Sequence, residues 1–311
     1  MKAHHFYHAH FDGSVGEYYP LFFRNLLLTL VTLGLYSAWA ATDNRRYFFS
    51  HLEIAGSRYH YHGTGRELLV GRLKAFGILL AIALVCLWAT FVLPEDYFFV
   101  IALCLYLLIF VMGPIAIIGM LRYRFSRTSW HNVRMSFTGD WREFLPIYVR
   151  GSLLSIISLG FYTPFFTIKA LRYLLGNTAL GNQRYGFDGD AIELMAIYLR
   201  GILFSILTLG IYYFWFLANY HGYVIDHITI SGHRYLFNAS GLDYLTLLVP
   251  QFALVFLTFG LALPIAYIQA AKFFAHHLYL ENSFDPQSIR PASVQRVGAT
   301  GDALHSVLGT T

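Results

Sequence analysis

A short acidic phrase recurs along this chain, each time just before a long apolar run. Four glycines are each followed four residues later by a glutamate, and an alanine and an aspartate repeat the relation a fifth time: Gly13 and Glu17, Gly63 and Glu67, Gly139 and Glu143, Gly189 and Glu193, Ala239 and Asp243. A hydroxyl or carboxylate stands three residues before each acid, at Ser14, Thr64, Asp140, Asp190 and Ser240. This is the arrangement of a capping box, so the sequence predicts five helix starts.

The apolar runs behind these caps share a length. A glycine stands 20 residues after four of the five caps, at Gly34, Gly160, Gly210 and Gly260. Twenty residues of helix extend about 30 Å, which is close to the thickness of the hydrocarbon layer of a bilayer.

Composition supports a membrane location. Hydrophobic residues make up 57% of the 311 residues and charged residues only 13%, about half the share of a typical soluble domain. The net charge of +5 comes mainly from arginines near the ends of the apolar runs, which suits membrane topology better than nucleic-acid binding. Cys86 and Cys104 both lie within apolar runs, so neither a disulfide framework nor a thiolate metal site is expected.

The repeats suggest a division of the chain into three parts. We expect a polar, histidine-rich tail over residues 1–10, a transmembrane domain over 11–281 and a disordered tail over 282–311. The domain would consist of five units that start near residues 11, 61, 137, 187 and 237. Glycine turns between β-branched and aromatic residues, at 53–62, 181–185 and 228–235, predict short β-hairpin linkers between the units.

The second unit differs from the others and bears on topology. It holds two apolar stretches, 68–93 and 98–119, each long enough to span. If every unit followed this plan, each would be a helical hairpin with its tip at the glycine, and the basic loops would share one side, as the positive-inside rule favours. The other units, however, contain only about 20 apolar residues, enough for one crossing or two half-depth legs. The sequence therefore predicts an all-α polytopic membrane protein with about six spanning helices, with helical hairpins as the alternative.

Charged residues also recur at fixed spacings. Each glutamate is followed seven residues later by a base on the same helix face, about 10 Å away, in the pairs Glu17 and Arg24, Glu67 and Lys74, Glu143 and Arg150, and Glu193 and Arg200. These residues either line a polar path or serve as caps and interfacial anchors. Arg46, Arg122 and Arg172 each lie 17 residues before the next unit's glycine. Arg45, Arg46, Arg122 and Arg124 are candidate contacts for lipid or a partner.

The chain resembles the YjgN family of bacterial inner-membrane proteins, a family of unknown function. The resemblance is carried by residues 11–17, 25–29, 32–36 with Trp39, 45–47 and 63–69, and it covers roughly residues 6–285. It implies a multi-pass protein of the bacterial cytoplasmic membrane and no established reaction.

Two functions follow as hypotheses. The first is a transporter or channel for a small polar or ionic solute, because transport folds are often built from internal repeats. The second is a non-catalytic membrane scaffold that binds anionic lipid or a protein through arginine-rich loops. No combination of nucleophile, base and orienting group is recognisable, so we expect no enzyme activity, cofactor or metal site. Membrane lipids and a second copy of the chain are the expected partners, and nucleic acid is not.

Overall fold

Helical hairpins alternate with strand pairs along the part of the chain that the structure describes. The computed structural model describes residues 6–92, 94 and 97–291. The helices are α1 (Val15–Val31), α2 (Ser37–Ser50), α3 (Gly65–Val92), α4 (Phe98–Ser126), α5 (Trp141–Ile157), α6 (Thr163–Gly176), α7 (Ala191–Leu207), α8 (Tyr213–Asp226), α9 (Gly241–Leu257) and α10 (Leu263–His277), with the short 3₁₀ helix η2 (Pro286–Ser288). The strands are β1 (Phe6–His8), β2 (His10–Phe11), β3 (Leu52–Ile54), β4 (Ser57–Tyr61), β5 (Thr128–Trp130), β6 (Val133–Phe137), β7 (Thr178–Leu180), β8 (Gln183–Phe187), β9 (Ile228–Ile230), β10 (His233–Phe237) and β11 (Leu278–Glu281).

The prediction of an all-α protein with about six spans is wrong. Eleven strands form one antiparallel sheet, and within the described residues only α3 and α4 are long and apolar enough to cross a membrane. Strand pairs do form where β-hairpins were predicted, but each pair also hydrogen-bonds to the next, as Tyr59 of β4 pairs with Trp130 of β5. The linkers therefore build a common sheet that the sequence did not predict.

The sheet closes almost into a ring through the N-terminal segment. Its two edge strands are β1 and β2, which are separated along the chain by Ala9 alone. Tyr7 pairs with Leu280 of β11, while His10 pairs with Glu53 of β3. The backbone N–H of Ala9 also donates to Leu278 O at 3.0 Å. Both ends of the sheet are thus held by one short stretch, part of the tail predicted for residues 1–10.

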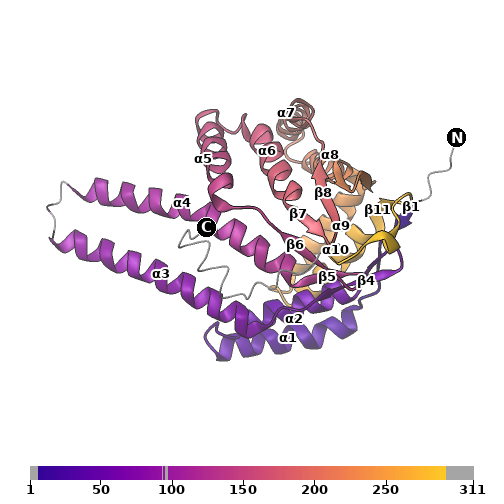
Figure 1. The fold of residues 1–311 in the computed structure, drawn as a ribbon, viewed down its shortest axis with the longest axis horizontal. Coiled ribbons are helices and arrows are strands. Elements are labelled where there is room, and N and C mark those ends of the chain that lie inside the picture. Colours follow the sequence, from indigo (N-terminus) through magenta and orange to yellow (C-terminus); the bar gives the residue numbers. More distant parts are fainter. Residues whose placement is uncertain (1–5, 93, 95–96, 292–311) are drawn as a thin grey trace.

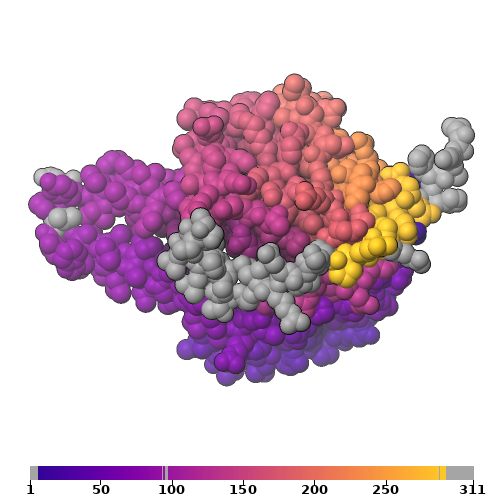
Figure 2. Space-filling model, viewed as in Figure 1, coloured from indigo at the N-terminus to yellow at the C-terminus, as the bar shows by residue number. Residues whose placement is uncertain are grey.

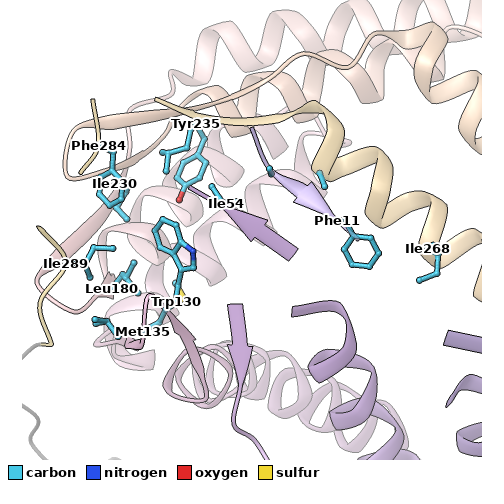
Figure 3. Packing of buried hydrophobic residues seen from close by; sticks show 14 of the residues in the cluster. Phe11, Ile54, Trp130, Met135, Leu180, Ile230, Tyr235, Ile268, Phe284 and Ile289 are labelled. Atoms are coloured by element: carbon cyan, nitrogen blue, oxygen red, sulfur yellow. The ribbon is translucent and has the colours of Figure 1, made fainter. Parts of the chain in front are cut away.

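Aromatic and aliphatic side chains fill the inside of this ring (Figure 3). Trp130 is fully buried, stacks on Tyr59 at a centroid distance of 5.5 Å and donates from Nε1 to Ser57 O at 3.1 Å. Phe284 stacks on the same indole at 6.1 Å, although it lies in the stretch predicted to be disordered from residue 282 onward. Residues 292–311 of that predicted tail lie outside the described residues.

Four of the apolar runs reverse direction instead of forming single helices. In the first, α1 ends at Val31 and Leu33 and Gly34 adopt positive φ angles of 50° and 92°. The N–H of Gly34 donates to Thr29 O at 2.7 Å and that of Leu33 donates to Leu30 O at 3.1 Å. This pair of bonds is the Schellman motif, which ends a helix and turns the chain back. Residues 159–160, 209–210 and 259–260 repeat the two positive φ values.

A hydroxyl completes the hydrogen bonding of each tip. Thr32 Oγ1 donates to Leu28 O at 2.7 Å and accepts the N–H of Tyr36 at 2.9 Å. Thr208 and Thr258 make the corresponding bonds. Ser158 accepts the N–H of Tyr162 in the same way but donates to Ser155 O, three residues earlier, at 3.4 Å. The side chains at the apex are apolar and exposed almost completely, at 95% for Leu33, 90% for Leu159, 95% for Leu209 and 97% for Phe259. An apolar tip whose backbone groups are satisfied internally meets the requirement for burial in lipid.

The hairpin α3–α4 reaches much farther than the other four. Its helices contain 28 and 29 residues, or about 42 Å each, whereas a 17-residue helix such as α1 extends about 25 Å. It projects as a separate arm from the body of the protein (Figure 1), and space-filling shows the outer half of the arm standing clear of the other hairpins (Figure 2).

Candidate functional site

Polar residues occupy matching positions halfway along the two helices of the short hairpins. We call six of them the polar belt: Arg24 and Asp43, Arg150 and Lys169, and Arg200 and Asn219. In each pair the first residue lies on the outgoing helix and the second on the returning helix. In α1–α2 the pair is a salt bridge, with Arg24 Nη2 2.7 Å from Asp43 Oδ2.

The other belt positions lack this charge complementarity. Hairpin α5–α6 places two cations, Arg150 and Lys169, where the first hairpin has a cation and an anion. Lys169 Nζ donates to the Tyr162 hydroxyl at 3.0 Å and lies 5.6 Å from that ring. No carboxylate of the described residues forms an ion pair with Arg150, Lys169 or Arg200. In α9–α10 the position of Arg24 is held by Pro250. Gln251, one residue later, donates from Nε2 to Oε1 of Gln269, which holds the position of Asp43, at 3.1 Å.

The repeated acids lie apart from the belt, near the sheet end of each hairpin. Glu17 Oε2 is 3.4 Å from the Tyr47 hydroxyl and 3.7 Å from His51 Nε2, both on the returning helix or just after it. Tyr173 and Glu143 repeat the first contact at 3.0 Å. The structure thus places Glu17 and Arg24 in separate networks, and each acid closes its own hairpin.

Glu67 has a different partner, because an arginine, Arg127, stands at the position that His51 holds in the first hairpin. Arg127 Nη2 lies 2.9 Å from Glu67 Oε1, and its Nε donates to Glu67 Oε2 at 3.2 Å. This two-point contact is the strongest geometry for an arginine and a carboxylate. It ties the base of α3 to the end of α4, where the long arm meets the sheet.

The arginines spaced 17 residues before a glycine join neighbouring units. Arg46, Arg122 and Arg172 donate from Nη2 to the carbonyl oxygens of Gly63, Gly139 and Gly189, at 2.8, 2.9 and 3.0 Å. We call these three hydrogen bonds the arginine staples. Each one links the returning helix of one hairpin to the loop that starts the next hairpin.

The staples account for half of the candidate lipid or partner contacts. Arg46 and Arg122 are engaged in them, and Arg45 Nη1 donates to the Tyr61 hydroxyl at 3.0 Å. Arg124 is exposed. Arg45, Arg46 and Arg122 are therefore engaged in contacts within the protein.

The residues predicted to line a polar path lie on the outside of the protein. Arg24, Lys74, Arg150 and Arg200 are all exposed, and the ring interior is filled by packed side chains such as Trp130 and Leu180. Within the described residues, the candidate path therefore does not pass through the ring. Burial raises the pKa of Tyr59 and of Tyr235 well above the usual 10, as expected for neutral phenols in a dry interior.

Sequence reasoning missed the second member of each belt pair. Asp43, Lys169 and Asn219 lie on the returning helices, which the six-span prediction did not separate from the outgoing ones. Superposing the units by their glycines would have placed these three residues at one shared position.

The fold and the belt together define a membrane protein built from helical hairpins on a strand ring, with one long apolar arm. The chain belongs to the family described as bacterial protein of unknown function (DUF898), whose pattern matches residues 6–204 and 213–307. It is similar to the inner membrane protein YjgN of Escherichia coli strain K12, at 31% identity over 156 residues, which cover 50% of this chain and 37% of that protein. The YjgN protein of Salmonella typhimurium is 33% identical over 75 residues, 24% of this chain and 19% of that protein.

These comparisons support the resemblance to the YjgN family and an inner-membrane location. The matched part spans little more than a third of the length of the E. coli relative. No solved structure matches the chain.

Proposed function

We propose that this protein is a non-catalytic membrane protein that inserts four short hairpins into one leaflet and binds anionic lipid at the polar belt. The depth of the hairpins supports this placement. Arg24 lies seven residues before the end of α1, about 11 Å of helix, and the turn extends this to roughly 15 Å. That is half of the ~30 Å hydrocarbon layer, so a belt at headgroup level puts the tips near the bilayer centre.

The long hairpin α3–α4 can also be placed with its basic residue at headgroup level, and it then crosses the bilayer completely. Lys74 lies 18 residues before the end of α3, a distance of about 27 Å, which is close to the ~30 Å of the hydrocarbon layer. One helical hairpin would then span the bilayer twice, while the other four enter and leave on the same side. The sheet and the arginine staples would lie in water on that side.

The two cations Arg150 and Lys169 are the observation that supports anionic lipid as the ligand. These residues occupy the two positions that form a salt bridge in α1–α2, yet both are cations. An anion between them would relieve their repulsion, and a lipid phosphate is the anion present at headgroup depth. A solute path receives no comparable support, because the belt cations are exposed around a filled ring.

The test introduces into α5–α6 the salt bridge that is present in the first hairpin. Lys169→Asp should create an internal salt bridge with Arg150 like that of Arg24 and Asp43. In detergent, adding phosphatidylglycerol should raise the Tm of the native chain more than adding phosphatidylcholine does. The variant should have a higher Tm without lipid and lose the selective response. Lys169→Gln, as matched control, should lose the response without the gain in Tm.

An equal response of the native chain to both lipids would overturn the proposal. A selective response that survives in Lys169→Asp would move the lipid site away from this hairpin and contradict the assignment of the pair.

A further inference from the structure

One junction between hairpins lacks its arginine staple. By the register of the units, Gly222 of α8 occupies the position of Arg46, Arg122 and Arg172, and it lies 17 residues before Ala239, which replaces the glycine. No guanidinium can therefore reach the Ala239 carbonyl from this position. A Cβ built on Gly222 would have only Phe237 O within 4 Å, at 3.6 Å, so the space that the arginine would fill is open.

The open space is a cleft of about 560 Å³ between α7, α8 and the start of α9. Its polar lining includes Arg200, Asn219, Asp226, Asn238 and Ser240, and Ala239 also borders it. A cation and an anion thus border one cavity, although they form no ion pair with each other. The cleft also adjoins the polar belt, to which Arg200 and Asn219 belong.

Both charged groups have capacity for a ligand. Arg200 donates from Nε to Ala196 O of its own helix at 3.2 Å, a bond that leaves the two terminal nitrogens of the guanidinium. Asp226 accepts the N–H of Phe237 at Oδ1, at 2.8 Å, which leaves Oδ2. A ligand for this cleft should therefore carry a negative group toward Arg200 and a positive group toward Asp226.

The order of the two charges along the hairpin matches a phospholipid. Arg200 lies level with Asn219, as Arg24 does with Asp43, and Asp226 lies seven residues farther from the tip, about 10 Å along α8. In a phospholipid the phosphate follows the acyl chains and a headgroup amine extends beyond it toward water. Two charged hydrogen bonds of about 2.8 Å leave about 4 Å between the ligand's charges, which suits a phosphate and an ammonium on a short carbon linker.

We propose that this cleft binds a phosphoethanolamine group, with its phosphate at Arg200 and its primary ammonium at Asp226 and the Ala239 carbonyl. The ammonium takes the place of the missing guanidinium. A primary ammonium donates three hydrogen bonds, whereas a quaternary choline donates none, so the cleft distinguishes the two headgroups. The proposal rests on the placement of the belt at headgroup level, but it involves a different hairpin from the pair Arg150 and Lys169.

The test measures lipid retained by the full chain in nanodiscs that contain equal amounts of phosphatidylethanolamine and phosphatidylcholine. The native chain should retain phosphatidylethanolamine preferentially. Asp226→Asn and Arg200→Gln should each reduce the preference about tenfold, the loss expected for one charged hydrogen bond. Soluble O-phosphoethanolamine, added as a competitor, distinguishes a soluble ligand from a lipid. If it displaces the bound lipid, both compounds bind at the same site. If it binds more tightly than phosphatidylethanolamine does, the ligand is a soluble compound.

Gly222→Arg is the decisive variant because it should remain folded. The arginine should fill the cleft and donate to the Ala239 carbonyl, which blocks the ligand and keeps or raises the Tm. Loss of the preference in this stable variant would support the site.

Equal retention of both lipids by the native chain together with no binding of O-phosphoethanolamine, or an unchanged preference in Gly222→Arg, would overturn the proposal. Lys169→Asp should leave the preference for phosphatidylethanolamine intact, so failure of the anionic-lipid proposal and failure of this one are separable.

Discussion

Arg172 donates a hydrogen bond across 3.0 Å to the carbonyl oxygen of Gly189, and in doing so it ties the end of one hairpin to the start of the next. The same contact joins Arg46 to Gly63 and Arg122 to Gly139. The bond fixes the loop that presents the next helix cap, so the hairpins are held in order around the ring by side chains as well as by strands.

Removing one arginine staple should weaken the fold. Arg172→Ala leaves the Gly189 carbonyl without its charged donor, and we expect a loss of about 1–2 kcal/mol in the free energy of unfolding, since the site is partly exposed to solvent. Denaturant unfolding in mild detergent measures this loss. Arg184→Ala, at an exposed strand position, is the matched control and should change stability by less than about 0.5 kcal/mol. Equal effects of the two substitutions would contradict a special role of the staple.

The hairpin tips should lie near the bilayer centre. A fluorophore on Leu209→Cys, in a chain without Cys86 and Cys104, should be quenched most strongly by lipids brominated deep in the acyl chain. Aqueous iodide should quench the fluorescence of this label only weakly. The comparison site is Ile192→Cys at the start of α7, which is 71% exposed and should be quenched by iodide. A tip label that responds to iodide as strongly as the Ile192 label would exclude half-depth insertion.

Closure of the ring should depend on the small size of residue 9. Ala9 is fully buried between β1 and β2, and the added atoms of Ala9→Leu have no space there. We expect a loss of about 1–3 kcal/mol from overpacking, measured by the same denaturant unfolding. The neighbouring substitution His10→Leu, at an exposed position, should cost far less. If both cost the same, the segment would not be packed as described.

The ring tyrosines should make the fold sensitive to alkali. Burial raises the pKa of Tyr59 and Tyr235 well above the ordinary value of 10, so the folded state holds these protons longer than the unfolded chain. Their contribution to stability is complete below pH 10 and is lost as the pH rises above it. Tyrosinate absorbance should therefore increase in one step together with loss of helical circular dichroism.

Tyr59→Phe provides the check on this pH dependence. With one buried phenol fewer, its stability should fall less steeply above pH 10 than that of the native chain. A gradual rise of tyrosinate absorbance in a protein that stays folded would show that the ring admits hydroxide and would contradict a dry interior.

The sequence predicted the positions of many local features correctly. The side chain of Ser14 accepts the N–H of Glu17 at 3.2 Å, and Ser240 and Asp243 form a full capping box. Such caps are visible in a sequence because both groups lie within one helical turn. The spacing of 17 residues between Arg46 and Gly63 was equally visible, but only the folded chain shows that it marks a hydrogen bond between units.

The helix reversals were harder to predict. Gly34 was identified as the end of an apolar run, yet the six-span prediction treated that run as a single crossing. A Schellman turn stabilised by Thr32 costs little in such a run, since its backbone groups remain bonded internally. Length alone could not separate one long helix from two shorter ones, and the structure forms two helices, α1 and α2, joined by a turn at Leu33 and Gly34.

By itself, the sequence determined the apolar character of the chain, its five capped helix starts and the positions of three strand pairs, because each depends on residues close together along the chain. Tertiary structure decided that the strands join into one ring, that Ala9 closes it, and that Arg24 forms a salt bridge with Asp43. These relationships connect residues 19 or more positions apart, or opposite ends of the chain, and they depend on hydrogen bonding and packing between elements that local patterns do not record.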